Sequence, residues 1–328
     1  MSLLSLPCFG RRTGGMLLAS LAFLLVLLGA SPAEAQPTFT VAAVNPPPTV
    51  FESAGNISFR ITLTGGTTGQ TYQVGYQTVD GTAVGSPPPG GDYTRVSGTV
   101  TLGPNANTTI TVPILEDASD EFDETFDFQL VAVGGANGAV IGANNSVTAT
   151  IVDNDPPPTL SISPTTTTRG VSGVQEGNGG VGNTNMVFTV SLSNPSGKPV
   201  SFQYSTANNT AVGTSSTDYT PQTGVTVNVP TDTASVTISI PITGDTQDEN
   251  DETFFVDIFN PVNATLSPNT RATGTILDDD TPSASINDVT VTEGNSGTVN
   301  ATFTVTLAQS SVQTVSIDYT VTPGTATQ

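Results

Sequence analysis

The chain has 328 residues, enough for two or three domains of ordinary size. Its formal net charge of -21, with only seven lysines and arginines, excludes the basic surface that nucleic acid or an anionic membrane would require. Glycine, proline, serine, threonine and asparagine are abundant and tryptophan is absent, which indicates an all-β protein.

The N-terminal residues 1–35 are predicted to form a secretory signal. Two arginines precede an apolar stretch at 16–30, and the small-residue pattern Ala33-Glu34-Ala35 follows it. We expect cleavage before Gln36 and export of a mature chain that lacks a membrane span and the only cysteine, Cys8. A retained anchor is the weaker alternative, because the apolar stretch has about 15 residues and a span needs about 20.

Beyond the signal, the chain repeats itself. Four acids recur at offsets of 124 to 128 residues: Glu52, Asp92, Glu124 and Asp155 return as Glu176, Asp218, Glu252 and Asp280. A third copy begins at Ser283 and stops at Gln328. We therefore expect domains over 36–156 and 157–281, and an incomplete copy over 282–328.

Apolar and polar residues alternate strictly within each copy, for example over 57–63, 186–192 and 302–307. This period of two is typical of strands with one buried and one wet face. About seven such segments per copy, separated by Gly, Pro and Asn, predict tandem immunoglobulin-like antiparallel β-sandwiches, with a barrel as the alternative. We expect Tyr93 and Tyr219 to be core or corner residues.

The ends of the copies predict the arrangement of the domains. Pro156-Pro157-Pro158 and Pro282 stiffen very short linkers, so we expect an extended rod with domains end to end. The third copy stops after about three strands and would leave half its core exposed. Either the chain is part of a longer protein, or this segment pairs with another molecule.

Two acidic loops follow the same plan. Residues 116–124 carry six carboxylates and residues 245–252 carry five. Two unit charges ~4 Å apart repel by roughly 4 kcal/mol at an effective dielectric near 20. The chain has no histidine and few cations to offset this repulsion, so a calcium ion, which takes oxygen ligands in flexible geometry, is the expected counterion. The alternative is a solvated loop that aids solubility.

Four motifs recur in order in both complete copies: an early V-x-E with Gly and Asn close behind it, an Asp-Tyr pair, an acidic loop ending in Glu-Thr-Phe, and a closing Asp-rich triplet. Together they resemble the Calx-beta domain, named after the calcium-binding regulatory domains of sodium–calcium exchangers. The resemblance covers residues 38–328. It implies a seven-stranded sandwich with calcium ions clustered at the end where each domain meets the next.

The resemblance also implies the ligands. In the first site they are Glu52, Asp92, Glu116, Asp117, Glu121, Glu124, Asp153 and Asp155. In the second they are Glu176, Asp218, Asp245, Glu249, Glu252, Asp278, Asp279 and Asp280. Asn154 and Gly244 depart from the acidic pattern, and the third copy offers only Glu293.

These features predict an exported, rod-like calcium-binding protein with a structural, adhesion or matrix role. Its expected partners are calcium ions and other surface or matrix proteins. The alternative is a metal-independent acidic spacer or stalk. An enzyme is disfavoured because the mature chain has no histidine or cysteine and its sole lysine is Lys198.

Overall fold

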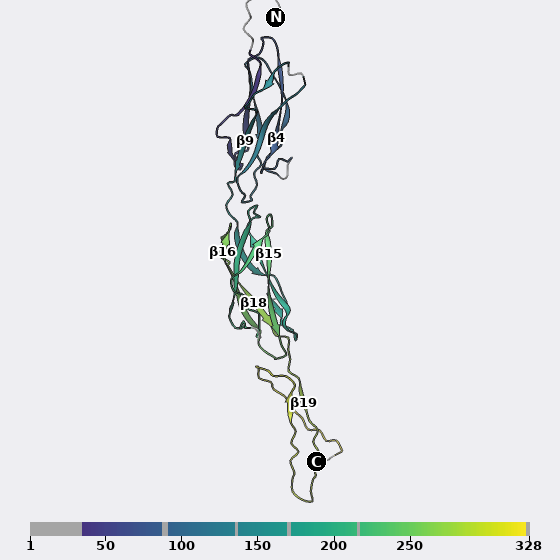
Figure 1. Cartoon of the computed structure of the whole chain (residues 1–328). Helices are drawn as coiled ribbons and strands as arrows, with labels where there is room; N and C mark the ends of the chain where they lie inside the picture. The colour runs from purple at the N-terminus through teal and green to yellow at the C-terminus, as the bar shows by residue number, and fades with distance from the viewer. Residues whose placement is uncertain (1–34, 87–90, 135–136, 169–171, 215–216, 326–328) are drawn as a thin grey trace, which may run out of the picture.

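The computed structural model describes residues 35–86, 91–134, 137–168, 172–214 and 217–325. The predicted signal lies outside these residues, except for Ala35. Two β-sandwiches follow one another along the chain and lie end to end, with a more open segment beyond them (Figure 1). None of the described residues forms a helix of the length and hydropathy that a membrane crossing requires.

The first sandwich packs two sheets, with strand orders β6-β3-β1-β8 and β2-β9-β7-β4-β5. Its strands are β1 (Thr38–Ala43), β2 (Thr49–Phe51), β3 (Asn56–Thr64), β4 (Tyr72–Asp80), β5 (Ser97–Leu102), β6 (Asn107–Pro113), β7 (Glu124–Val131), β8 (Val140–Ile141) and β9 (Ser146–Val152). A 3-10 turn, η1 (Glu52–Ala54), follows β2.

The second sandwich repeats this order, with sheets β15-β12-β10-β17 and β11-β18-β16-β13-β14. Its strands are β10 (Thr159–Pro164), β11 (Gly173–Gln175), β12 (Gly180–Leu192), β13 (Val200–Asn208), β14 (Val225–Val229), β15 (Ser235–Gly244), β16 (Glu252–Val262), β17 (Thr265–Leu266) and β18 (Arg271–Leu277). The predicted immunoglobulin-like sandwich is therefore confirmed for both copies.

Short strands at the sheet edges add detail that the alternation pattern does not contain. Prolines 46–48, which cannot donate to a ladder, separate β1 from β2. The two pieces consequently join opposite sheets, β1 beside β3 and β2 beside β9. The β2–β9 pair is parallel, as is the edge pair β1–β8, whereas the long ladders are antiparallel.

Each sandwich buries its own aromatic core. In the first, Phe59 stacks on Phe128 at 4.5 Å between ring centroids, and Tyr93 stacks on Phe126 at 4.2 Å. In the second sandwich, the equivalent pair is Tyr219 stacked on Phe254. Both tyrosines are buried, as predicted, and their hydroxyls donate to Asp80 and Asn208.

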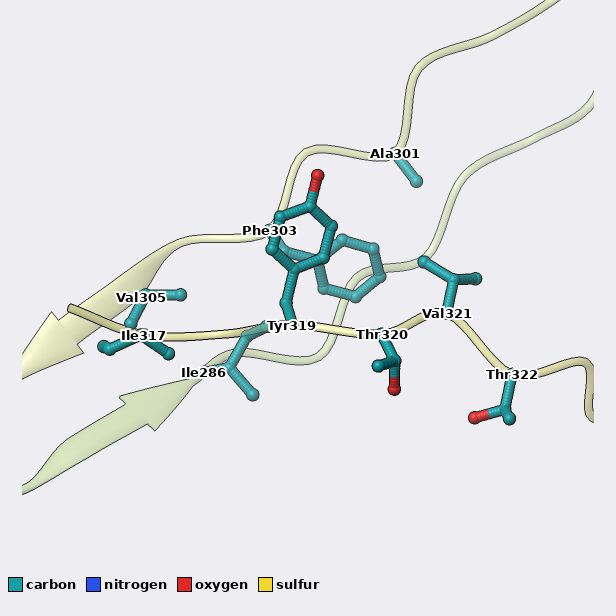
Figure 2. A pocket seen from close by; sticks show the side chains of 9 residues that line it. All are labelled: Ile286, Ala301, Phe303, Val305, Ile317, Tyr319, Thr320, Val321 and Thr322. Atoms are coloured by element: carbon teal, nitrogen blue, oxygen red, sulfur yellow. The ribbon is translucent and has the colours of Figure 1, made fainter.

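The third copy forms only β19 (Ala284–Ile286) paired with β20 (Val305–Leu307) within its described part. Its apolar side chains face a hollow of about 730 Å³ in which Phe303, Ile317 and Tyr319 lie close together (Figure 2). Phe303 is 56 % exposed, whereas Phe188, its equivalent in the second sandwich, is fully buried. Within its described part, this segment thus carries strand-like sequence without a closed core.

Candidate calcium sites at the sandwich ends

The acidic residues of the first sandwich gather at the end that faces the second. Glu52 opens η1, Asp92 lies between β4 and β5, Glu121 lies between β6 and β7, and Glu124 is the first residue of β7. Asp153 and Asp155 follow β9, on the segment that leads into the second sandwich. Because Glu52, Glu124 and Asp153 lie next to strand ends, the backbone holds these carboxylates close together despite their repulsion.

The structure divides these acids into two neighbouring groups. Carboxylate oxygens of Glu52, Asp153 and Asp155 lie within 4.8 Å of one another. Carboxylate oxygens of Asp92, Glu121 and Glu124 form a second group and also lie within 4.8 Å of one another. Asp92 is oriented by the Val84 N–H, which donates to its Oδ2 at 2.6 Å.

The second sandwich repeats the first group with Glu176, Asp278 and Asp280. The equivalents of the other group also lie near one another, because Asp218 makes a side-chain hydrogen bond with Glu252 and the charge of Glu249 helps to raise the pKa of Glu252. The Val212 N–H holds Asp218 Oδ2 at 2.6 Å, as Val84 holds Asp92. Both copies therefore build the same arrangement from equivalent positions.

Burial and crowding raise the pKa of three of the glutamates, Glu52, Glu124 and Glu176. Burial, followed by the charges of Asp117 and Asp153, raises the pKa of Glu52 to about 7. Burial, with Asp245 as the largest charge effect, raises the pKa of Glu176 to about 8. The pKa of Glu124 rises to about 8 through burial and its hydrogen bond with Asp92. At neutral pH the metal-free clusters thus hold protons that isolated carboxyl groups would release.

Three buried oxygens in these groups lack a hydrogen-bond partner within the described part of the chain: Glu52 Oε2, Asp155 Oδ2 and Asp280 Oδ2. A buried, unpaired carboxylate oxygen is costly unless a cation meets it. Calcium binds oxygen at 2.3–2.6 Å, so oxygens up to about 5 Å apart can share one ion. The spacing and the unpaired oxygens both fit a bound calcium ion.

Some predicted ligands lie outside the tight groups. Glu116, Asp117, Asp245 and Asp279 are exposed. Asp117 and Asp245 each accept a backbone N–H from two residues ahead, and Asp279 accepts the Gly177 N–H at 3.0 Å. Asn154, the equivalent of Asp279, similarly binds Ser53. This position fastens the turn around Glu52 or Glu176, which explains why an amide can replace the acid.

One residue at this end escaped the sequence analysis. Lys198, in the loop between β12 and β13 of the second sandwich, forms ion pairs with Asp120 and Asp153 of the first. Asp120 is only 3 % exposed. Lys198 and Asp120 are 78 residues apart, and neither lies in a motif that pairs them. The one sequence signal that could have suggested this contact is that Lys198 is the only lysine in a strongly acidic chain.

Comparison with known protein families and solved structures identifies the family of this chain. The Calx-beta domain family model matches residues 35–155 and 168–280. Among solved structures, CBD12 from CALX1.2 is 20 % identical over 71 % of this chain and 83 % of its own, with a TM-score of 0.32. The calcium binding domain CBD12 of CALX1.1 is 20 % identical over 67 % and 78 %, with a TM-score of 0.30. The apo-form Calx CBD1 domain is 23 % identical over 37 % and 100 %, with a TM-score of 0.31. No curated protein matches the chain.

Proposed function

The chain belongs to the Calx-beta domain family, and on that premise we propose that it is a calcium-binding rod whose joints are stiffened by the ions. Calcium would bind at the end of each complete sandwich. The observation that carries this proposal is the set of unpaired buried oxygens on Glu52, Asp155 and Asp280, each within a group of three carboxylates. A solvated acidic loop would not need to bury and orient them.

Glu52, Asp153 and Asp155 would hold one ion in the first sandwich, with Asp92, Glu121 and Glu124 beside them for another. Glu176, Asp278 and Asp280 would hold the equivalent ion in the second. A bound ion supplies two positive charges where the fold has concentrated negative ones. The protein's own contribution is to fix η1, the acidic loop and the exit of the last strand relative to one another.

The proposed setting is outside the cytoplasm, with a structural, adhesion or matrix role and calcium ions plus other surface or matrix proteins as partners. The predicted signal and the high acidity support this setting. The elongated arrangement of the sandwiches suits a protein that holds a surface or matrix partner at a distance (Figure 1). The role proposed here is architectural rather than catalytic.

Calcium titration calorimetry on the full chain tests the proposal. The double variant Glu52→Gln and Glu176→Gln keeps the side-chain size but removes one charge from each site, so we expect about a tenfold or greater loss of affinity. Glu293→Gln is the matched control, because Glu293 is exposed and lies outside the groups. An absence of calcium binding by the unmodified chain at millimolar concentrations would favour the metal-independent acidic spacer.

A further inference from the structure

The acidic loop of the first sandwich (residues 116–123) contacts a specific surface on the second. This surface is the loop between β12 and β13, residues 193–199, which we name the docking loop. Asp120 and Ser196 form a parallel β-bridge, and Ser196 Oγ donates to the Asp120 carbonyl at 3.0 Å. Asn194 Nδ2 donates to the Ala118 carbonyl at 3.0 Å. The two loops therefore meet in a defined register.

The same register recurs where the second sandwich meets the third copy. Asp248 and Ser311 form the equivalent parallel bridge, and the Val312 N–H donates to the Asp248 carbonyl at 3.0 Å. Ser311 occupies the position of Ser196, and Gln313 that of Lys198. Gln313 Nε2 donates to the Glu249 carbonyl at 2.8 Å. Both junctions thus share the Asp–Ser bridge, but the residue two positions after the serine differs, being Lys198 at the first and Gln313 at the second.

At the first junction, the residue two positions after the bridging Ser196 is Lys198, the only lysine of the chain. Lys198 Nζ lies 2.5 Å from Asp120 Oδ1 and 3.3 Å from Asp153 Oδ2. It also lies 5.6 Å from the centroid of the Phe122 ring. Asp120 belongs to the acidic loop and Asp153 to the exit from β9, so one ammonium group holds two separate elements of the first sandwich.

Burial makes the loss of one partner of this clamp costly. The side chains of Lys198, Asp120 and Asp153 are 20 %, 3 % and 8 % exposed. Removing the lysine would leave the buried Asp120 side chain without its cationic partner. By contrast, the ion pairs Arg95–Asp80 and Arg271–Asp257 are more exposed, and each lies within one sandwich. Of the ion pairs among the described residues, those of Lys198 are the ones that join two sandwiches.

We propose that the docking loop is the interaction surface for the acidic loop of the preceding domain, and that Lys198 locks the first junction without calcium. The linker 153–158 attaches the second sandwich at one point, and the docking loop adds a second, so rotation about the linker is blocked. The second junction has a neutral Gln313 in place of the lysine, and the ion pairs of the described residues include none that crosses it. None of these contacts requires a metal, and Asp120, the most buried partner of Lys198, lies outside the proposed calcium groups, whereas Asp153 belongs to both.

Distance measurement by double electron–electron resonance tests the lock. Spin labels are placed in the full chain at Thr109→Cys in β6 and Ser239→Cys in β15, which are exposed positions, with Cys8→Ser removing the native thiol. All samples contain a chelator, so calcium cannot hold the joint. We expect a narrow distance distribution for the parent chain and one about twofold broader or more for Lys198→Gln, since small inter-domain contacts permit motion by default.

Two further variants make the result specific. Asp120→Asn removes the other half of the pair and should broaden the distribution as well, whereas Lys198→Arg should keep it narrow because it retains the charge. Arg271→Gln is the matched control, since it removes a positive charge and an ion pair within the second sandwich and should change nothing. An unchanged width in both Lys198→Gln and Asp120→Asn, or equal broadening by Arg271→Gln, would overturn the proposal.

Discussion

Glu52 and Glu176 show how the role of a single residue can be inferred from a repeat. Both follow a short edge strand, and both are nearly fully buried beside other carboxylates. Their equivalence at an offset of 124 residues is enough to indicate a shared role. The sequence could not indicate that Asp279 and Asn154 instead fasten the turn, because an acid that accepts a backbone N–H looks the same as one that binds a metal.

The raised pKa values predict how the metal-free protein responds to pH. The pKa values of Glu52 and Glu176 are about 7 and about 8 in the folded chain, against an ordinary value of 4.5. The folded state therefore binds protons more tightly than the unfolded state, so this contribution to stability is present below about pH 4.5 and is lost as pH rises through 7 to 8. In chelator, we expect the melting temperature to fall by several degrees between about pH 5.5 and about pH 8.5.

Differential scanning calorimetry across that pH range measures the effect. The double variant Glu52→Gln and Glu176→Gln should show a flatter profile, because glutamine does not titrate. A metal-free melting temperature that rises with pH over the same range would contradict the assignment of these two residues as the main buried acids.

At the level of strands, alternation was sufficient to identify the long elements. The pattern over 57–63 and 186–192 matches β3 and β12, which bury Phe59 and Phe188 in the cores. The short pieces β2, β8, β11 and β17 were not predicted, because two or three residues carry no periodicity. Their positions depend on which sheet edge is free, and that is a property of the assembled sandwich.

Equivalent phenylalanines in a closed and an open copy give a matched test of the core. Phe188→Ala should lower the free energy of unfolding of the second sandwich by roughly 3–5 kcal/mol, since it empties a fully buried position. Phe303 occupies the equivalent position in the third copy and is half exposed. Phe303→Ala should therefore change the free energy of unfolding of the chain by less than about 0.5 kcal/mol.

Urea unfolding followed by circular dichroism compares the two variants. A loss of similar size for Phe303→Ala would show that residues 283–325 pack into a cooperative unit, contrary to the open arrangement in Figure 2.

At the scale of the molecule, the proline-containing linkers and the terminal acids predicted domains arranged end to end, and the structure shows them in that order (Figure 1). The contact that we propose fixes their relative orientation was not predicted. It joins Lys198 to Asp120 across 78 residues, and its geometry exists only after both sandwiches have folded. At the first junction, Lys198 would add to the stiffness that we propose calcium supplies.

We propose that a divalent ion offsets the repulsion among these buried carboxylates. The most direct test is the melting temperature of the full chain at about pH 7.5, measured in chelator and in millimolar calcium, with magnesium as the comparison. An ion that binds only the folded state at about 100 times its Kd adds about 2.7 kcal/mol, so we expect calcium to raise the melting temperature by several degrees and magnesium to raise it less. Identical melting temperatures in chelator and calcium would contradict the account.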